Sequence, residues 1–222
     1  MEGNIVVVAG GSGGLGQSVV PTFRKAGAKV ITADRHPPAA LVADGTAMKA
    51  DVTDDNDVRR LVEEVLQREG RIDALVNLVG GFTTGRVVET DRTAWDRMLT
   101  LNLTAAFVLS KAVLPRMLER RAGRIIHIAA RAAVEPFPGA AAYVVSKAGL
   151  AALIRVLSLE TAGSGVTING ILPSTIDTPA NRKSMPDADV AKWVKPDSIA
   201  GLIAFLISEN AGRINGALIP VG

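Results

Sequence analysis

Short runs of apolar residues alternate with longer stretches of helical periodicity along the whole chain. The short, β-branched runs predict strands at residues 5–9, 29–33, 47–50, 74–77, 124–129, 167–172 and 217–220. The longer stretches predict helices at residues 14–26, 55–69, 92–121, 140–162 and 196–208. Apolar runs flanked by helices indicate strands that are covered on both faces, and hence a parallel sheet.

The order of these elements predicts one α/β domain over residues 1–222. Right-handed crossovers between parallel strands give a Rossmann-type doubly wound parallel sheet, here of about seven strands with helices on both faces. No internal repeat and no linker rich in Pro, Gly or Ser divides the chain. The least regular segment, residues 173–195, carries three prolines. A loop of that length in a compact domain is typical of a lid over a substrate.

Composition narrows the classes of function. The 25 basic and 22 acidic residues give a formal charge of +3 without a long run of one sign, which indicates no nucleic-acid partner. The absence of cysteine excludes disulfides, thiolate catalysis and zinc–cysteine sites, and two histidines are too few for a histidine-rich metal site. The N-terminus lacks a charged leader, and no apolar stretch reaches membrane-spanning length without interruption. We therefore expect a cytoplasmic protein with neither a metal nor a membrane partner.

Gly10, Gly14 and Gly16 lie in a glycine-rich segment that follows the first strand and opens the first helix. Glycine permits positive φ angles and lets backbone N–H groups approach a pyrophosphate at the start of the helix. A glycine-rich turn alone is a weak signal, but this placement predicts dinucleotide binding.

Asp34 follows the second predicted strand, eighteen residues after Gly16. A carboxylate there accepts hydrogen bonds from an adenosine ribose and repels a 2′-phosphate. We therefore expect NAD(H) to be preferred over NADP(H). The neighbouring Arg35 partly offsets that repulsion, so NADP(H) remains possible. Asp51 follows the third strand and is either an adenine contact or an ordinary residue at the start of a helix.

Tyr143 and Lys147 lie four residues apart, on one face of a predicted helix. An ammonium group beside a phenol favours the phenolate and so lowers the pKa of the tyrosine. A tyrosine tuned in this way can exchange a proton while a cofactor moves a hydride.

These motifs together resemble the short-chain dehydrogenases/reductases over essentially the full length of the chain. The glycine-rich segment resembles the family's nucleotide loop, and residues 173–178 resemble the segment that holds the nicotinamide carboxamide. The resemblance implies that Tyr143 supplies a proton, that Lys147 also binds the nicotinamide ribose, and that Asn102 is a structural or proton-relay residue. It also implies a homodimer or homotetramer through the long helices at 92–121 and 140–162.

The motifs and this resemblance assign a set of residues to the cofactor. They are Gly10, Ser12, Gly13, Gly14, Leu15, Gly16, Asp34, Arg35, Asp51, Val52, Asn77, Val79, Gly80, Lys147, Pro173, Thr175 and Thr178.

Three positions depart from the family pattern. Ala130 stands thirteen residues before Tyr143, where the family has a catalytic serine. Leu78 replaces an asparagine and Ser174 replaces a glycine. Ser146 shares the helix with the tyrosine but is a poor geometric substitute for the missing hydroxyl.

The stretch around Ala130 and the segment from Leu172 to Asp189 resemble a narrower group, the quinonoid dihydropteridine reductases, which also have alanine at the serine position. That resemblance implies a preference for NADH. Ketone reduction builds charge on one oxygen, which a second hydroxyl donor stabilises. A quinonoid pterin spreads the incoming electron pair over a conjugated ring and needs that donor less, so Ala130 favours a conjugated acceptor.

Ala130, Phe82 and Arg131 are the predicted substrate residues. Three further side chains, Phe137, Met185 and Trp193, either line a flat pocket or pack in the core and lid, and His127 is predicted to be a core histidine. We therefore expect an NAD(P)H-dependent oxidoreductase that reduces a quinonoid dihydropterin-like or other conjugated small molecule. The alternatives are a general carbonyl reductase of the 3-oxoacyl type and a non-catalytic dinucleotide-binding regulator.

Overall fold

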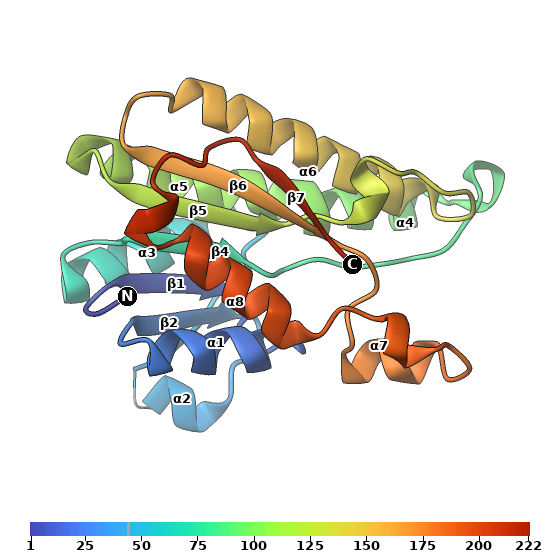
Figure 1. The fold of residues 1–222 in the computed structure, drawn as a ribbon, viewed down its shortest axis with the longest axis horizontal. Coiled ribbons are helices and arrows are strands. Elements are labelled where there is room, and N and C mark those ends of the chain that lie inside the picture. Colours follow the sequence, from blue (N-terminus) through green and yellow to red (C-terminus); the bar gives the residue numbers. More distant parts are fainter. Residues whose placement is uncertain (44) are drawn as a thin grey trace.

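A seven-stranded sheet is the centre of the computed structural model, which describes residues 1–43 and 45–222. The strands are β1 (Ile5–Ala9), β2 (Lys29–Asp34), β3 (Ala47–Lys49), β4 (Ala74–Asn77), β5 (Gly123–Ile128), β6 (Val166–Pro173) and β7 (Leu218–Val221). All neighbouring pairs are parallel, in the order β3-β2-β1-β4-β5-β6-β7 (Figure 1). The predicted fold class, a doubly wound parallel α/β sheet, is confirmed.

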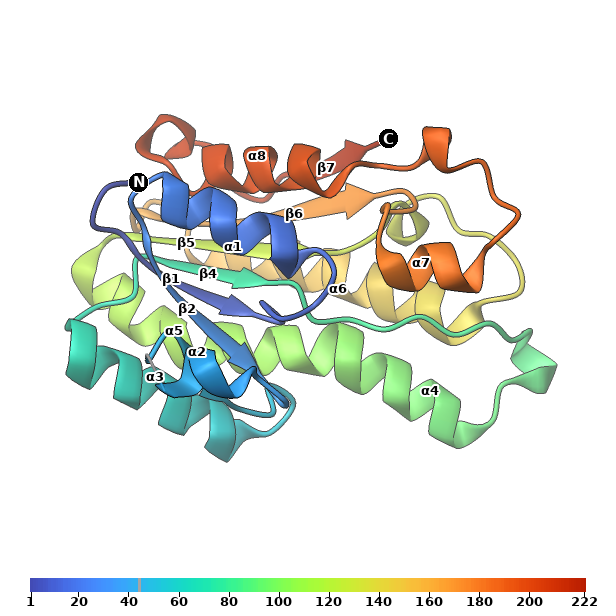
Figure 2. The same cartoon turned by 90° about the horizontal axis from the view of Figure 1, so that it is seen from below.

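Helices cover both faces of the sheet, as Figure 2 shows. They are α1 (Gly16–Lys25), α2 (Ala39–Ala43), α3 (Asp55–Glu69), α4 (Arg92–Leu99), α5 (Ala105–Arg120), α6 (Ala141–Glu160), α7 (Pro179–Ser184) and α8 (Pro196–Leu206). Alternate strand residues point to opposite faces, so Val7 packs in the core beneath α3, α5 and α6, and Val8 packs beneath α1 and α8. This double coverage is the reason why the strands are continuously apolar.

The predicted helix at 92–121 is interrupted. A π-helical turn, Thr100–Thr104, separates α4 from α5. Such turns add a residue to the helix and occur often at functional sites. The pattern of apolar residues did not predict this turn. It also did not predict the short helices α2 and α7.

Within the described residues, two helical stretches have the length and hydropathy of a membrane span, Arg92–Arg120 and Ala141–Glu160, by length and composition only. Charged residues interrupt both, among them Lys111 in the first and Lys147 in the second, as the sequence analysis expected. About half of each stretch is buried inside the protein, at 50% and 44% of the residues tested. Packing against the sheet and against each other accounts for the apolar composition of these helices.

The segment predicted as a lid leaves the sheet at the end of β6 and contains α7. Its two ends are fastened together, because Val194 N–H donates to the Thr175 carbonyl at 2.8 Å and Asp177 N–H donates to the Val194 carbonyl at 2.9 Å. Arg182 forms a two-pronged ion pair with Asp177 at 2.6 and 2.8 Å. The excursion is thus a closed loop that stands beside the carboxyl ends of the strands (Figure 1).

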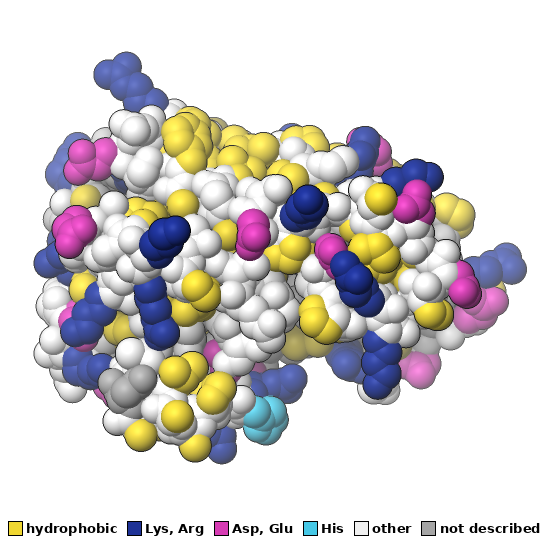
Figure 3. Space-filling model, turned by 60° about the horizontal axis from the view of Figure 1, so that its bottom comes forward, with side chains coloured by type: hydrophobic (Ala, Val, Ile, Leu, Met, Phe, Trp, Pro, Cys, Tyr) yellow, Lys and Arg dark blue, Asp and Glu magenta, His cyan; other side chains and the backbone are white. Residues whose placement is uncertain are grey.

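Surface charge is mixed on the face that Figure 3 presents. Basic and acidic side chains are interspersed there, with apolar groups between them. This distribution agrees with the balanced charge of the sequence.

Candidate active site

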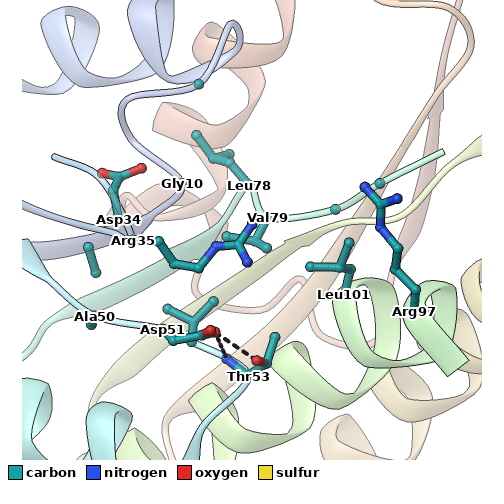
Figure 4. A pocket seen from close by; sticks show the side chains of 15 residues that line it. Gly10, Asp34, Arg35, Ala50, Asp51, Thr53, Leu78, Val79, Arg97 and Leu101 are labelled. Carbon is teal, nitrogen blue, oxygen red and sulfur yellow. Dashed lines mark hydrogen bonds between the residues drawn. The ribbon is translucent and has the colours of Figure 1, made fainter. Parts of the chain in front are cut away.

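A cavity of about 330 Å³ opens at the carboxyl edge of the sheet, where the chain passes from β1 outward and later returns at β4 (Figure 4). Ligands of open α/β sheets bind at such a switch point. Eight of the predicted cofactor residues line it, Gly10, Gly13, Asp34, Arg35, Asp51, Val52, Val79 and Gly80. The other predicted cofactor residues are not part of its lining.

The glycine-rich turn forms one wall of the cavity. Gly10 has a φ of +81° and donates its N–H to the Ala33 carbonyl, which turns the chain sharply away from β1. Gly16 packs so closely on Gly11 that a side chain there would overlap the Gly11 carbonyl. Leu15 is buried beneath the turn, immediately before α1 begins. This glycine cradle at the start of a helix fits the pyrophosphate of a dinucleotide.

Asp34 lies beside this turn. Its carboxylate accepts the Ser12 N–H at 3.1 and 3.3 Å, which places a negative charge where the sequence predicted a ribose contact. Figure 4 shows the exposed Arg35 side chain extending from the next position toward Val79. The two neighbouring side chains point in different directions, so the carboxylate lies at the glycine-rich turn and the guanidinium group lies toward Val79 (Figure 4).

Asp51 belongs to the cavity wall, but its carboxylate is already engaged. Oδ1 accepts the Thr53 N–H at 2.9 Å and the Thr53 hydroxyl at 2.7 Å, and the hydroxyl contact is the main cause of its lowered pKa. The helix that follows is capped by Asp54, whose side chain accepts the N–H groups of Asn56 and Asp57. Asp51 is thus a turn residue before α3 and not the residue that caps it.

Tyr143 and Lys147 lie on one face of α6 as predicted, but their electrostatics differ from the prediction. The Lys147 ammonium donates to the Ile128 carbonyl at 2.9 Å, and burial lowers its pKa to about 8. Burial raises the pKa of Tyr143, and no opposing effect of the lysine is resolved. The expectation that Lys147 lowers the tyrosine pKa is therefore wrong for this structure, because desolvation dominates.

Asn102 is buried in the π-helical turn and joins two elements. Its amide nitrogen donates to the Gly81 carbonyl at 3.0 Å and to Ser146 Oγ at 2.9 Å, and its oxygen accepts the Gly81 N–H at 2.8 Å. Both of its N–H donors are thus used to hold the segment after β4 against α6. A methyl group added to Gly80 would lie 2.9 Å from Asn102 Oδ1 and 3.2 Å from Lys147 Nζ, so only glycine fits there comfortably.

Ala130 follows β5 and is buried, with 5% of its surface exposed. The hydroxyl of Ser146 donates to the Tyr143 carbonyl at 2.7 Å while accepting from Asn102, so it is occupied within α6. Arg131 turns toward the end of the chain, where it donates to the Gly222 carbonyl at 2.6 Å and pairs with Glu135 at 2.8 Å. A role for Arg131 in substrate binding has no support in these contacts.

The aromatic candidates Phe82 and Phe137 lie in two different parts of the structure. Phe82 packs edge-on against Tyr143, with ring centroids 4.8 Å apart, while 59% of its surface stays exposed. Phe137 lines a second, largely apolar cavity of about 420 Å³ with Val87, Val88 and Val144. Phe82 is therefore the one of these two rings that adjoins the predicted proton donor.

Among the predicted residues at the end of β6 and beyond it, Thr178 lies close to the glycine-rich turn. Pro173 is buried at the end of the strand, and the Thr175 carbonyl accepts the Val194 N–H that closes the loop containing α7. The Thr178 hydroxyl caps α7 by accepting the Asn181 N–H at 3.3 Å. A methyl group added to Gly14 would lie 3.1 Å from Thr178 Cβ, so this threonine stands directly over the turn.

Several residues of the cavity were not predicted from the sequence. They are Ala33, Ala50, Thr53, Leu78, Gly81, Arg97 and Leu101. Arg97 is the one with a formal charge, and Figure 4 shows its side chain rising from α4 toward the cavity. Its position one helical turn before Leu101 was the only available signal, since both side chains then share a face of the helix.

Comparisons with known proteins support the same assignment. A family model described as short chain dehydrogenase matches residues 4–189. The chain belongs to the short-chain dehydrogenase family. It is therefore an NAD(P)-dependent oxidoreductase, and the reading as a non-catalytic regulator has no support.

Curated relatives extend over nearly the whole chain. The 3-oxoacyl-[acyl-carrier-protein] reductase FabG of Thermotoga maritima is 29% identical over 238 residues, covering 100% of this chain and 97% of the relative. The acetoacetyl-CoA reductase of Allochromatium vinosum is 32% identical over 237 residues, covering 98% and 96%. Among solved structures, the aldohexose dehydrogenase of Thermoplasma acidophilum matches with a TM-score of 0.91 and 28% identity, covering 99% of this chain and 92% of that one.

Proposed function

We propose that this oxidoreductase uses NADH to reduce a conjugated heterocycle, and that a quinonoid dihydropterin is its best substrate. One observation carries the proposal. Ala130 has no hydroxyl group, and the hydroxyl of Ser146 already donates its hydrogen bond to the Tyr143 carbonyl. A site with one phenolic donor suits an acceptor that delocalises the incoming electron pair, because charge does not gather on a single oxygen.

The preference for NADH rests on Asp34. Its carboxylate is fixed by the Ser12 N–H at the β2 end of the cavity, where a 2′-phosphate would bring a second negative charge. The glycine cradle would hold the pyrophosphate, and Gly80, Lys147 and Thr178 would surround the nicotinamide half. When bound, NADH supplies the hydride.

Tyr143 then completes the reduction by giving a proton to the acceptor. Its raised pKa keeps the phenol protonated at neutral pH, which is the form that a donor requires. Lys147, with a pKa of about 8, is mostly charged at pH 7 and can return a proton toward the phenol. Asn102 holds the wall beside both groups, and its assigned role is to position them and not to transfer protons itself.

A second candidate is a carbonyl reductase acting on 3-oxoacyl groups. The names of the FabG and acetoacetyl-CoA relatives favour it. In this alternative the missing hydroxyl would lower the rate by up to about 10²–10³, or another group would stabilise the oxyanion.

The same proposal includes self-association in the cytoplasm as a dimer or tetramer. Exposed apolar side chains on α5 and α6 support it, among them Phe107, Leu118, Val156 and Leu159. Light scattering on the purified protein measures the mass directly, and a monomer at micromolar concentration contradicts this part.

The test of the proposed activity is the oxidation of NADH by purified protein supplied with quinonoid dihydropterin. The Tyr143→Phe variant measures the non-enzymatic background. Turnover above that background supports the proposal. Tight NADH binding without turnover on pterin, quinone or ketone substrates contradicts it.

A further inference from the structure

A chain of three buried polar side chains runs beneath the cavity wall that follows β4. Asn77 ends β4, His127 lies in the neighbouring β5, and Ser110 projects from α5. Their exposed fractions are 2%, 0% and 1%. A buried polar group without a hydrogen-bond partner lowers the stability of the fold. The hydrogen bonds among these three side chains are therefore strongly determined.

The direction of every hydrogen bond in this chain follows from one donor. Val79 N–H donates to Asn77 Oδ1 at 3.0 Å, which identifies the oxygen of that amide. The amide nitrogen therefore faces His127 Nδ1, at 3.4 Å, and donates to it. His127 must then carry its proton on Nε2, which donates to Ser110 Oγ at 3.0 Å.

The neutral form of His127 is also the form that its surroundings favour. Complete burial, aided by the nearby charge of Lys147, lowers its pKa to about 3. The imidazole thus remains an acceptor toward Asn77 throughout the neutral range.

Val79 links this buried chain to the cavity. Residues Leu78, Val79, Gly80 and Gly81 all line the cavity. Gly80 in turn closely approaches both Lys147 and Asn102. A change in the orientation of the Asn77 amide would therefore shift a wall that touches the cofactor space and the catalytic lysine.

We propose that His127 is a positioning residue for the dinucleotide. It fixes the orientation of the Asn77 amide, which holds Val79 and so the cavity wall at 78–81. This inference rests on the proposed function in one respect, the placement of NADH in the cavity beside that wall.

Two substitutions of His127 separate positioning from simple filling of the core. In His127→Asn, the side-chain oxygen takes the place of Nδ1 and accepts from Asn77, but the contact with Ser110 is lost. In His127→Gln, the longer amide reaches Ser110 but leaves no acceptor opposite Asn77. Both variants therefore keep a polar side chain at position 127. The asparagine variant keeps the hydrogen bond with Asn77, and the glutamine variant keeps the hydrogen bond with Ser110.

The experiment is a fluorescence titration of NADH, compared with the exchange rate of the Val79 amide hydrogen. We expect His127→Gln to raise the Kd by about 3- to 10-fold, the effect of one lost hydrogen bond, and to speed exchange at Val79. We expect His127→Asn to stay within about twofold of the parent protein in both measurements. A control, Ile126→Val, loses packing on the opposite face of β5 and should leave both values unchanged.

Equal Kd values and equal Val79 exchange in the two His127 variants would overturn the inference, as would a larger effect of asparagine than of glutamine. Failure of the parent protein to bind NADH would instead contradict the proposed function. The exchange of Val79 would still test His127 in that case, because it requires no cofactor. If His127→Gln does not fold, the same exchange measurement on His127→Asn decides, and fast exchange at Val79 there contradicts the inference.

Discussion

At the scale of single residues, burial shifts the pKa values of both Tyr143 and Lys147. Burial keeps the proton on the phenol and eases its removal from the ammonium group, whose pKa falls to about 8. The sequence predicted the two residues and their shared helix face. It did not predict the direction of either pKa shift, because desolvation depends on groups from distant parts of the chain, among them the Phe82 ring beside Tyr143 and the Ile128 carbonyl beside Lys147.

Replacing Tyr143 by phenylalanine should lower kcat by about 10²–10⁴ because the proton donor is lost. The Kd of NADH should stay within about twofold, since the phenol oxygen forms no contact in the glycine cradle. Steady-state kinetics and NADH titration measure the two effects separately. Loss of NADH binding would show that the tyrosine is mainly structural.

Restoring a hydroxyl with Ala130→Ser tests the meaning of the alanine. Reduction of a 3-oxoacyl thioester should rise by up to about 10²-fold, because a second donor then reaches the developing oxyanion. Reduction of a quinonoid dihydropterin should change little. Parallel kcat/KM measurements decide, and a large fall in pterin reduction would count against an acceptor that needs no serine.

His127 should make the protein sensitive to acid. Its folded pKa of about 3 lies below the ordinary value of 6.5, so the unfolded chain binds a proton that the folded protein refuses. Stability is then lost as the pH falls from about 6.5 toward 3, with a slope of up to about 1.4 kcal/mol per pH unit. Urea unfolding between pH 7 and 4 measures this slope, which should be smaller in His127→Asn. An unchanged slope would assign the acid sensitivity to other groups.

At the scale of elements, the regular strands and helices were predictable and the irregular ones were not. The residues of α3 were predicted with the bounds 55–69 that the structure shows, because Asp54 caps one end and Gly70 ends the other with a φ of 75°. The π-helical turn at Thr100–Thr104 escaped prediction because it adds a single residue to the helical ladder, and no glycine or proline marks it in the sequence.

That turn matters because it presents Asn102 to the segment after β4. Adding a methyl group in Gly80→Ala should push this segment away from Asn102 and Lys147. We expect the KM for NADH to rise by about tenfold or more and the melting temperature to fall by a few degrees, on the order of the cost of overpacking. Kinetics and thermal unfolding measure these effects. Activity equal to that of the parent protein would show that the segment moves freely.

At the scale of the whole molecule, the topology brings the site together. Four residues of the site, Gly10, Asp34, Asp51 and Val79, lie at or just beyond the carboxyl ends of four different strands, and the parallel order β3-β2-β1-β4 places those ends along one edge. The sequence predicted these residues because each follows a strand in a recognisable motif. Arg97 and Leu101 come from a helix, where no motif marks them, and the turning of Arg131 toward Gly222 depends on the folded chain.

The central claim is that Tyr143 without a serine partner serves a conjugated acceptor. The most direct test is the ratio of kcat/KM for quinonoid dihydropterin to that for a 3-oxoacyl thioester, measured with NADH on the unmodified protein. The account predicts a ratio of about 10² or more, the contribution of one oxyanion donor. A ratio near one, or one that favours the thioester, would contradict it.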